Sequence, residues 1–320
     1  MMHGVDASLT NVPGLAEPHY LAGALVERMF AFAPTAGAAL NIGLVSHLGV
    51  ACIGTLSDAD AVTEPELLNE LIATGISEVI DAAERTPRTE RSDPLADPGD
   101  AETAASEPPE AERLSAVDTS FLRLETPDAP LHIGGVFVLE GEHLRDSEGR
   151  IRLDDARRRI ESRLRHIPRF KRRLSVVPFG LGRPLWVDHE EFDIERHVQL
   201  TSVVQPGEPQ DLLDLCAELY TEPLDRNVPL WELWLVDGLA DGRVGIVEKV
   251  HHALIDGISG VELAAAIFDG QADPVEDGSI DDTPAVPDPP AEQRAAEALV
   301  EQLVDPIQTV ERVGTSLLRS

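Results

Sequence analysis

Seven consecutive residues hold the most reactive combination of side chains in this sequence of 320 residues. Residues 251–257 read HHALIDG, which places two imidazoles, a carboxylate and a glycine within one short segment. A neutral imidazole can remove a proton from a hydroxyl group near neutral pH, because its ordinary pKa is about 6.5. The segment therefore predicts a site of general-base catalysis.

The flanking residues predict how this segment is held. An apolar run over residues 244–250 reads as a strand, and residues 260–268 have the spacing of an amphipathic helix. The polar residues thus fall on a loop between two rigid elements, where functional groups are commonly placed. Consecutive side chains that leave a strand point to opposite faces, so we expect His251 and His252 to differ in role.

Two other chemistries fit the segment less well. A metal site could use His251, His252 and Asp256, but adjacent, opposed side chains make poor joint ligands, and no further His/Cys cluster completes a shell. A covalent mechanism through Ser259 would need a nucleophile-elbow pattern, which the surrounding sequence lacks. A pair of purely structural core histidines is the plain alternative, and the nearby Asp256 argues against it.

A wider set of motifs resembles one protein family. HHxxxDG is the signature of the CoA-dependent acyltransferase superfamily, and LSAVDTSFL at residues 114–122 resembles the opening of the bacterial wax ester synthase/diacylglycerol acyltransferase family. Further matching motifs follow in the family's order: LHIG at 131–134, PRF at 168–170, PLW at 184–186 and PLWE at 229–232. The resemblance covers residues 114–320.

This resemblance implies a fold and a reaction. The fold is α/β, a chloramphenicol acetyltransferase-like two-layer mixed sheet with flanking helices, here with an incomplete second domain. The reaction moves a long-chain acyl group from acyl-CoA to diacylglycerol or a fatty alcohol, which yields triacylglycerol or wax ester. His252 is implied as the general base, with His251 and Asp256 orienting the loop and Gly257 allowing a tight turn. Acyl-CoA is the co-substrate, and no metal or bound cofactor is expected.

The first segment, residues 1–83, resembles the C-terminal end of the same family through its motifs LTNVPG and LNI. Thr10 and Leu15 stand where the family motif has Ser and Pro, so Asn11 is only a weak candidate for substrate binding. A family tail thus precedes a family N-terminal domain, and the central part of the second domain is missing from the pattern. A permuted gene, a fusion and a fragment of a disrupted gene all remain open.

Hydrophobic patterns predict the elements of this first segment. Residues 40–46 and 50–56 read as two buried strands, and residues 67–80 have helical spacing. The stretch 29–56 contains no charged residue and is long enough to cross a bilayer, but its Pro and Gly residues favour the two strands.

The remaining sequence divides into four parts. Residues 84–113 form an acidic, proline-rich linker that is expected to be disordered, and residues 114–269 form the acyltransferase domain. An acidic connector over 270–290 and an amphipathic helix over 291–320 follow. Within the acyltransferase domain the patterns predict strands at 133–139, 233–237 and 244–250, a hairpin of 174–179 with 183–188, and helices at 153–167 and 212–220.

Composition limits the partners and the compartment. The net charge is -32, from 58 acidic and 26 basic residues, and this argues against a nucleic-acid partner. An acidic surface with only two lysines resembles proteins of a high-salt cytoplasm, although acidic linkers carry part of the excess. Cys52 and Cys216 are too few for a disulfide framework, and no signal-peptide pattern opens the sequence. We expect a cytoplasmic protein that is peripheral to a membrane or to lipid inclusions.

Eleven basic residues over positions 150–173 form a local exception to the acidic composition. Arg158 and Arg159 are candidates for a surface that attracts CoA phosphates or anionic lipid. A solvated helix face balanced by acidic neighbours is the equal alternative. Trp186 and Trp231 read as core residues rather than substrate contacts, and Trp231 is retained as a weak binding candidate.

Two functional hypotheses follow. The first is an acyl-CoA-dependent O-acyltransferase with His252 as its base. The second is a catalytically weak or incomplete acyltransferase-like domain that binds lipid or needs a partner polypeptide, because elements of the missing region are not supplied. A homo-oligomer or a complementing polypeptide is compatible with both.

Overall fold

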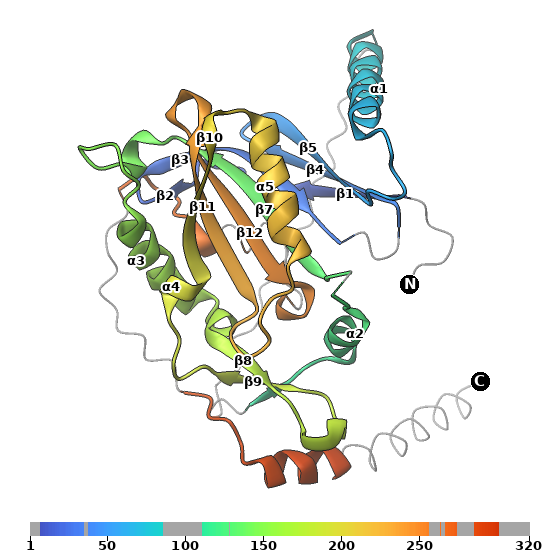
Figure 1. Ribbon diagram of the computed structural model, residues 1–320, viewed down its shortest axis with the longest axis vertical. Helices are drawn as coiled ribbons and strands as arrows, with labels where there is room; N and C mark the ends of the chain where they lie inside the picture. Colours follow the sequence, from blue (N-terminus) through green and yellow to red (C-terminus); the bar gives the residue numbers. More distant parts are fainter. Residues whose placement is uncertain are drawn as a thin grey trace.

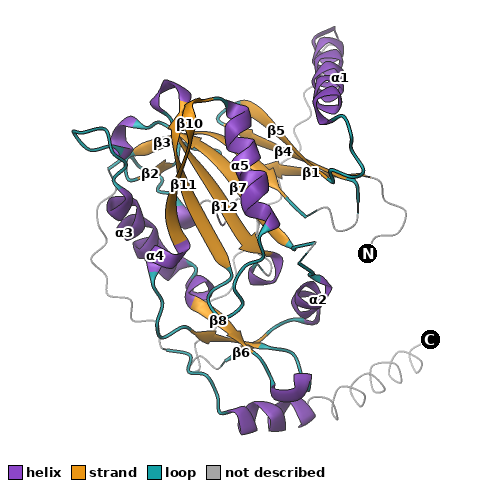
Figure 2. Ribbon diagram, in the orientation of Figure 1, coloured by secondary structure: helices purple, strands orange, loops and turns teal. Residues whose placement is uncertain are grey.

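A mixed six-stranded sheet lies at the centre of the molecule, with one long helix across a face (Figures 1 and 2). The computed structural model describes residues 7–34, 38–85, 111–127, 129–255, 263, 266–273 and 285–300. In spatial order the central sheet comprises β10 (Val198–Gly207), β11 (Trp231–Leu239), β12 (Val244–His251), β7 (His132–Leu139), β3 (Ala24–Phe32) and β2 (Tyr20–Leu21). Strands β10 and β11 are parallel, and the other neighbours are antiparallel.

Two smaller sheets and a set of helices complete the described architecture. The first small sheet has the order β1 (Ala7–Pro13), β4 (Leu40–His47) and β5 (Val50–Ser57), and the second has β6 (Glu112–Arg113), β9 (Leu185–Asp188) and β8 (Arg172–Ser175). The labelled α-helices are α1 (Pro65–Arg85), α2 (Ala116–Leu124), α3 (Leu153–Arg163), α4 (Ile194–His197) and α5 (Pro209–Thr221), and residues 291–300 form a further helix.

Strand β12 carries the histidine segment, and all eight of its residues are buried. It lies between β11 and β7, so both of its edges are hydrogen-bonded. One face packs on α5, where Val247 meets Cys216 and Tyr220. The other face belongs to the main core, with Ile246 and Val250. A strand that is held at both edges and both faces fixes the direction in which its last residues leave the sheet.

Strand β3 joins the first segment of the chain to the acyltransferase body. It pairs with β7, so that Met29 lies opposite Phe137, and it also packs against β4 and β5. The approach of β4 is close: a Cβ atom at Gly43 would lie 2.3 Å from the Ala31 carbonyl oxygen, so only glycine fits there. Residues far apart in the sequence therefore build one continuous sheet and one core.

The sequence pattern does not predict β3, and a local irregularity of this strand explains why. Glu27 and Arg28 interrupt its apolar run, and the pairing with β7 shifts register between Val26 and Arg28. A bulge of this kind breaks the two-residue alternation that marks a strand. The Glu27 carboxylate pairs with Arg243 at 2.6 Å. Strands β1 and β10 were likewise absent from the prediction.

The other predicted elements are present. The two strands expected between residues 40 and 56 are β4 and β5, joined at Leu48 and Gly49, and both of these residues have positive φ. The expected mixed α/β class, the strands β7, β11 and β12, the β8–β9 hairpin and the helices α1, α3 and α5 are all confirmed. In the part of the chain that the structure describes, no helix is long and apolar enough to cross a membrane.

Some predicted boundaries shift, and some predicted segments lie outside the described residues. Helix α1 runs to Arg85, and residues 112–113 form β6 against β9, so both ends of the expected linker are ordered elements rather than disordered chain. These two residues are recruited because β9 offers a free edge. The helix predicted after the histidine segment and the acidic connector lie mostly outside the described residues, and residues 291–300 are helical.

Helix α1 projects away from the sheets (Figure 1). Its apolar residues are exposed, including Leu71 at 61% and Val79 at 68%. An amphipathic helix usually buries this stripe against a neighbour. The described residues supply no such neighbour for α1.

Candidate functional site

His252 lies at the end of β12, where the strand passes into a short 3-10 turn over His252–Leu254. The backbone fixes this position from both sides. The His251 N–H donates to the Leu230 carbonyl oxygen, and the His252 N–H donates to that of Leu131, each at 3.0 Å. The segments that the sequence analysis matched as PLWE and LHIG therefore anchor the histidine turn.

The His252 ring lines a cavity and stacks on Phe121 of α2, with ring centroids 4.0 Å apart and planes inclined by 30°. Its Nδ1 atom is buried and has no hydrogen-bond partner among the described residues. Burial lowers the pKa of His252 below its ordinary value, and the neighbouring His251 adds to this effect. The ring is therefore neutral at pH 7, which is the form that can accept a proton.

The side chain of His251 occupies a different environment from that of His252. It is 1% exposed, and its Nδ1 accepts the Ala253 N–H at 3.0 Å, which closes the turn. Its Nε2 lies 3.5 Å from the Oε1 atom of Glu125, and His132 Nε2 lies 3.6 Å from the same oxygen. His251 thus belongs to a buried polar cluster behind the cavity.

Glu125 is the centre of this cluster. Its side chain is 5% exposed, and Oε2 accepts a hydrogen bond from Arg226 at 2.6 Å. Burial alone would raise the pKa of Glu125, but the contacts with His251 and Arg226 outweigh it and lower that pKa to about 2. Burial lowers the pKa of His132 to about 4. A fixed negative charge therefore lies behind the turn and holds it in place.

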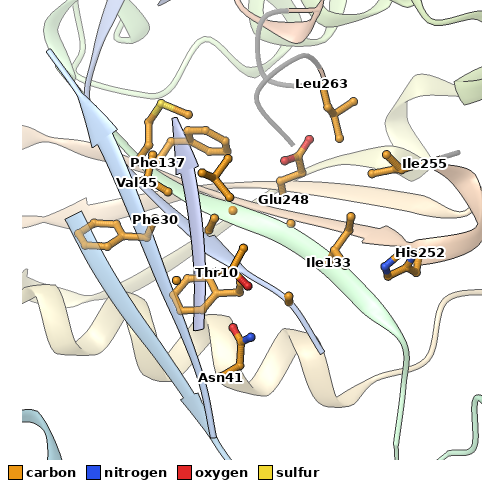
Figure 3. Close-up of a pocket in the computed structure, with 18 residues that line it drawn as sticks. Thr10, Phe30, Asn41, Val45, Ile133, Phe137, Glu248, His252, Ile255 and Leu263 are labelled. Carbon is orange, nitrogen blue, oxygen red and sulfur yellow. The ribbon is translucent and has the colours of Figure 1, made fainter. Parts of the chain in front are cut away.

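The cavity has a volume of about 200 Å³ and is lined by both segments of the chain (Figure 3). Most of its wall is apolar, and the polar side chains on it are those of Thr10, Asn41, Glu248 and His252. Asn41 is 2% exposed and donates to the Ser8 hydroxyl at 2.6 Å. An apolar cavity of about 150 Å³ already accepts a small hydrocarbon ring, so this space suits part of an apolar chain.

The structure does not bring every predicted site residue to the cavity. Asn11 lies exposed on β1, although its neighbours Thr10 and Val12 line the cavity, because alternate residues of a strand face opposite sides. Trp231 is 1% exposed, its indole N–H donates to the Phe170 carbonyl oxygen, and it lies in the core rather than on the cavity wall. Asp256 and Gly257 lie outside the described residues.

The two arginines predicted to bind anions, Arg158 and Arg159, lie in different environments. Arg159 forms a two-pronged ion pair with Asp269, in which Nε lies 2.6 Å from Oδ2, and Asp269 is 1% exposed. Its guanidinium is engaged in the interior, so the proposed phosphate contact does not fit this residue. Arg158 is exposed and pairs with Asp155 on its own helix. The acidic neighbours along residues 150–173 favour the solvated, balanced face.

Three site residues were not identified from the sequence. Phe121 lies inside the LSAVDTSFL motif, so the resemblance marked its segment without giving it a role. Glu125 and Glu248 are single carboxylates in unremarkable contexts, and only their burial sets them apart. In the described ranges, no group of His, Cys, Asp and Glu side chains is arranged to hold a metal ion.

Comparison with known families agrees with this geometry. The model of the wax ester synthase/diacylglycerol acyltransferase catalytic domain matches residues 114–320, and that of the family's C-terminal domain matches residues 1–79. The first match covers more than half of the sequence, so the chain belongs to the wax ester synthase/diacylglycerol acyltransferase family. The domain that the family calls C-terminal precedes the catalytic domain here.

Several relatives are similar to part of the chain. A probable diacylglycerol O-acyltransferase of Mycobacterium tuberculosis, tgs3, is 36% identical over 157 residues, which are 49% of this chain and 56% of that protein. A second, tgs1, is 39% identical over 158 residues, which are 49% of this chain and 33% of that protein. The solved wax ester synthase/diacylglycerol acyltransferase from Marinobacter aquaeolei VT8 is 32% identical, with a TM-score of 0.38, over 48% of this chain and 36% of that one.

Proposed function

We propose that this chain is an acyl-CoA-dependent O-acyltransferase that transfers a long-chain acyl group to diacylglycerol or a fatty alcohol. The observation that carries the proposal is the position of the His252 ring on the wall of an apolar cavity, where burial lowers its pKa. Family membership and the names of the relatives supply the reaction class. The acceptors are lipids, so we place the reaction in the cytoplasm, at the surface of a membrane or a lipid inclusion.

The proposed reaction needs one proton carrier. His252 removes the proton of the acceptor hydroxyl while the oxygen forms a bond to the thioester carbonyl carbon. The resulting tetrahedral intermediate then collapses, the C–S bond breaks, and the imidazolium returns its proton to the leaving CoA thiolate. Such a positioned base typically contributes about 10²- to 10⁴-fold to the rate. The chemistry requires no resident metal or cofactor, and acyl-CoA is a co-substrate.

The surrounding residues keep the base in place and unprotonated. Phe121 restrains the ring by stacking, and the cluster of His251 and Glu125 holds the turn from behind. Strand β12 is hydrogen-bonded along both edges and all its residues are buried, so it gives the turn that carries the ring a rigid support. We infer that a hydroxyl group delivered along the cavity meets the imidazole without competing solvent.

A second candidate function rests on the exposed face of α1 and on the partial coverage of the relatives. A domain whose helix leaves Leu71 and Val79 in solvent is suited to binding a lipid or a complementing polypeptide. In that case the chain has weak activity or none until the partner is added. A second copy of this chain could also be the partner that covers the exposed face of α1.

Ester synthesis from radiolabelled palmitoyl-CoA and either dioleoylglycerol or hexadecanol tests the proposal. The wild-type chain is expected to form ester, and His252→Ala is expected to lose about 10²- to 10⁴-fold. His143→Ala, which removes an exposed histidine away from the cavity, is the matched control and should keep full activity. Product that persists unchanged in His252→Ala rules out the assigned base. Product that forms only after a neighbouring gene product is added supports the second candidate.

A further inference from the structure

One carboxyl group stands inside the otherwise apolar part of the cavity. Glu248 lies in the middle of β12, is 4% exposed and lines the cavity wall. Its Oε1 atom is buried and makes no hydrogen bond within the described part of the chain. In Figure 3 the carboxyl projects from the strand toward the side on which Leu263 lies. A buried polar atom without a partner costs about 1–3 kcal/mol, so it calls for an explanation.

No cation of the described residues pairs with Glu248. Among the described residues that line the cavity there is no Lys or Arg. The adjacent Lys249 leaves the strand on the opposite face, where its Nζ donates to the carbonyl oxygens of Leu219 and Glu222 and pairs with Glu232. Burial raises the pKa of Glu248 to about 8. The group is therefore a neutral carboxylic acid near pH 7, which both donates and accepts hydrogen bonds.

Glu248 stands apart from the reacting centre. His251, at the end of β12, lies three positions further along the strand, and each step advances the chain by about 3.3 Å, so the two backbone positions are roughly 10 Å apart. His252 follows immediately in the turn. A ligand whose reacting end lies at His252 would therefore need a second polar group, further along its chain, to form a hydrogen bond with Glu248.

We propose that the cavity binds an apolar chain bearing a neutral oxygen group, such as a hydroxyl, well removed from its reacting end, and that Glu248 is the hydrogen-bonding partner of that oxygen. This inference rests on the proposed function for the identity of the reacting end. It narrows the substrates to chains that are oxygenated along their length. A chain of plain methylene groups fills the same space but leaves the Glu248 oxygen without a partner.

A neutral oxygen is favoured over a ligand cation. An ionised carboxylate and an ammonium group would both have to be desolvated in a cavity whose wall is mostly apolar, and this penalty commonly exceeds the attraction gained. A neutral pair of hydroxyl and carboxylic acid avoids that cost. Glu248 therefore selects by hydrogen bonding rather than by charge.

Calorimetric titration of the whole chain with three matched probes tests the inference: decanol, the diol with a hydroxyl at both ends, and the amino alcohol of the same length. At pH 7 the wild type should bind the diol about 2- to 10-fold more tightly than decanol, which is the range of one net hydrogen bond. Glu248→Leu should bind the two equally or prefer decanol, and Glu248→Gln should keep most of the preference because an amide also donates and accepts.

Thr10→Val is the matched control, because it removes the hydroxyl of another side chain on the same wall and leaves Glu248 in place. Unchanged preference for the diol in this variant supports the assignment to Glu248. Loss of the preference in Thr10→Val, equal binding of diol and decanol by the wild type, or tighter binding of the amino alcohol would each overturn the inference. Circular dichroism and thermal melts of each variant establish that it is folded.

The binding experiment is independent of turnover. If the wild type forms no ester but shows the diol preference, the proposed function fails and the oxygen-binding role of Glu248 stands. If ester forms with His252 as the base but the three probes bind alike, the proposed function stands and the oxygen-binding role of Glu248 fails. If both proposals hold, the wild type should also have a higher kcat/KM for the diol than for decanol as acceptor, and Glu248→Leu should lose this difference.

Discussion

Two histidines that are adjacent in the sequence have different environments and different roles in the site. His252 faces the cavity with a lowered pKa, whereas His251 is buried against Glu125 and closes the turn through the Ala253 N–H. The difference arises because the chain leaves β12 in a fixed direction. One imidazole is therefore available for proton transfer, and the other positions it.

The lowered pKa of His252 predicts the pH dependence of the reaction. The base must be neutral, so kcat/KM should fall only when the pH drops through the pKa of His252, and that midpoint should lie below the ordinary value of about 6.5. Initial rates of ester formation between pH 4.5 and 8 measure it, with pH 7 activity after each exposure as a check on unfolding. A midpoint above 6.5 would contradict a buried, neutral base.

At the scale of elements, three parts of the chain converge on Asp269. Helix α3 supplies Arg159, the residue's own segment follows the histidine turn, and its backbone exchanges two hydrogen bonds of 2.8 Å with Tyr20 of β2. The first segment of the chain is thus tied to the acyltransferase body at a buried ion pair as well as through β3. The position of the cavity wall depends on both connections.

This arrangement predicts that substitution of two neighbouring arginines changes the free energy of unfolding by very different amounts. Arg159→Ala removes the two-pronged partner of the buried Asp269 carboxylate and leaves only the longer contact with Arg163, at 4.0 Å, so it should lower the free energy of unfolding by about 3 kcal/mol. Arg158→Ala removes an exposed pair with Asp155 and should change it by at most about 1 kcal/mol. Urea denaturation followed by tryptophan fluorescence measures both. Equal, small losses of stability in the two variants would show that the ion pair of Arg159 with Asp269 does not stabilise the fold.

At the scale of the whole molecule, two segments that match two family domains build one cavity. The strands β1, β3 and β4 of the first segment supply one part of the wall, and β7, β12 and the histidine turn supply the other. The order of the two domains along the chain does not affect this, because contacts in space define the site. The excess of acidic residues is also a property of the whole molecule, and its self-repulsion lowers the stability of the folded chain.

A net charge of -32 predicts that salt stabilises the folded chain. Self-repulsion opposes the compact state, and at about 1 M salt the screening length falls to roughly 3 Å, which removes most of it. The melting temperature should rise between low salt and molar KCl. Calorimetry over a KCl series measures this, and sorbitol at matched osmolality controls for solute exclusion. A melting temperature that is flat or falls with KCl would mean that local ion pairs, and not the net charge, dominate.

The family, the mixed α/β class, most strands and helices, and His252 as the candidate base could all be predicted from the amino-acid sequence. These conclusions depend on local order: hydrophobic periodicity reports which face of an element is buried, and HHxxxDG is contiguous. The hairpin of β4 and β5 was predictable for the same reason, since its turn and its alternation lie within a few residues of each other.

Contacts between residues that are distant in the sequence could not be predicted and became known from the folded chain. Strand β3 has an interrupted pattern, so its place beside β7 followed from packing, and the two-part cavity followed from β3. Phe121 and Glu125 reach the histidines from α2 and its end, more than a hundred residues away in the sequence. Burial, not residue type, separates Glu248 from dozens of solvated carboxylates and Arg159 from its exposed neighbour. Such environments are sums over distant atoms, which a linear pattern does not contain.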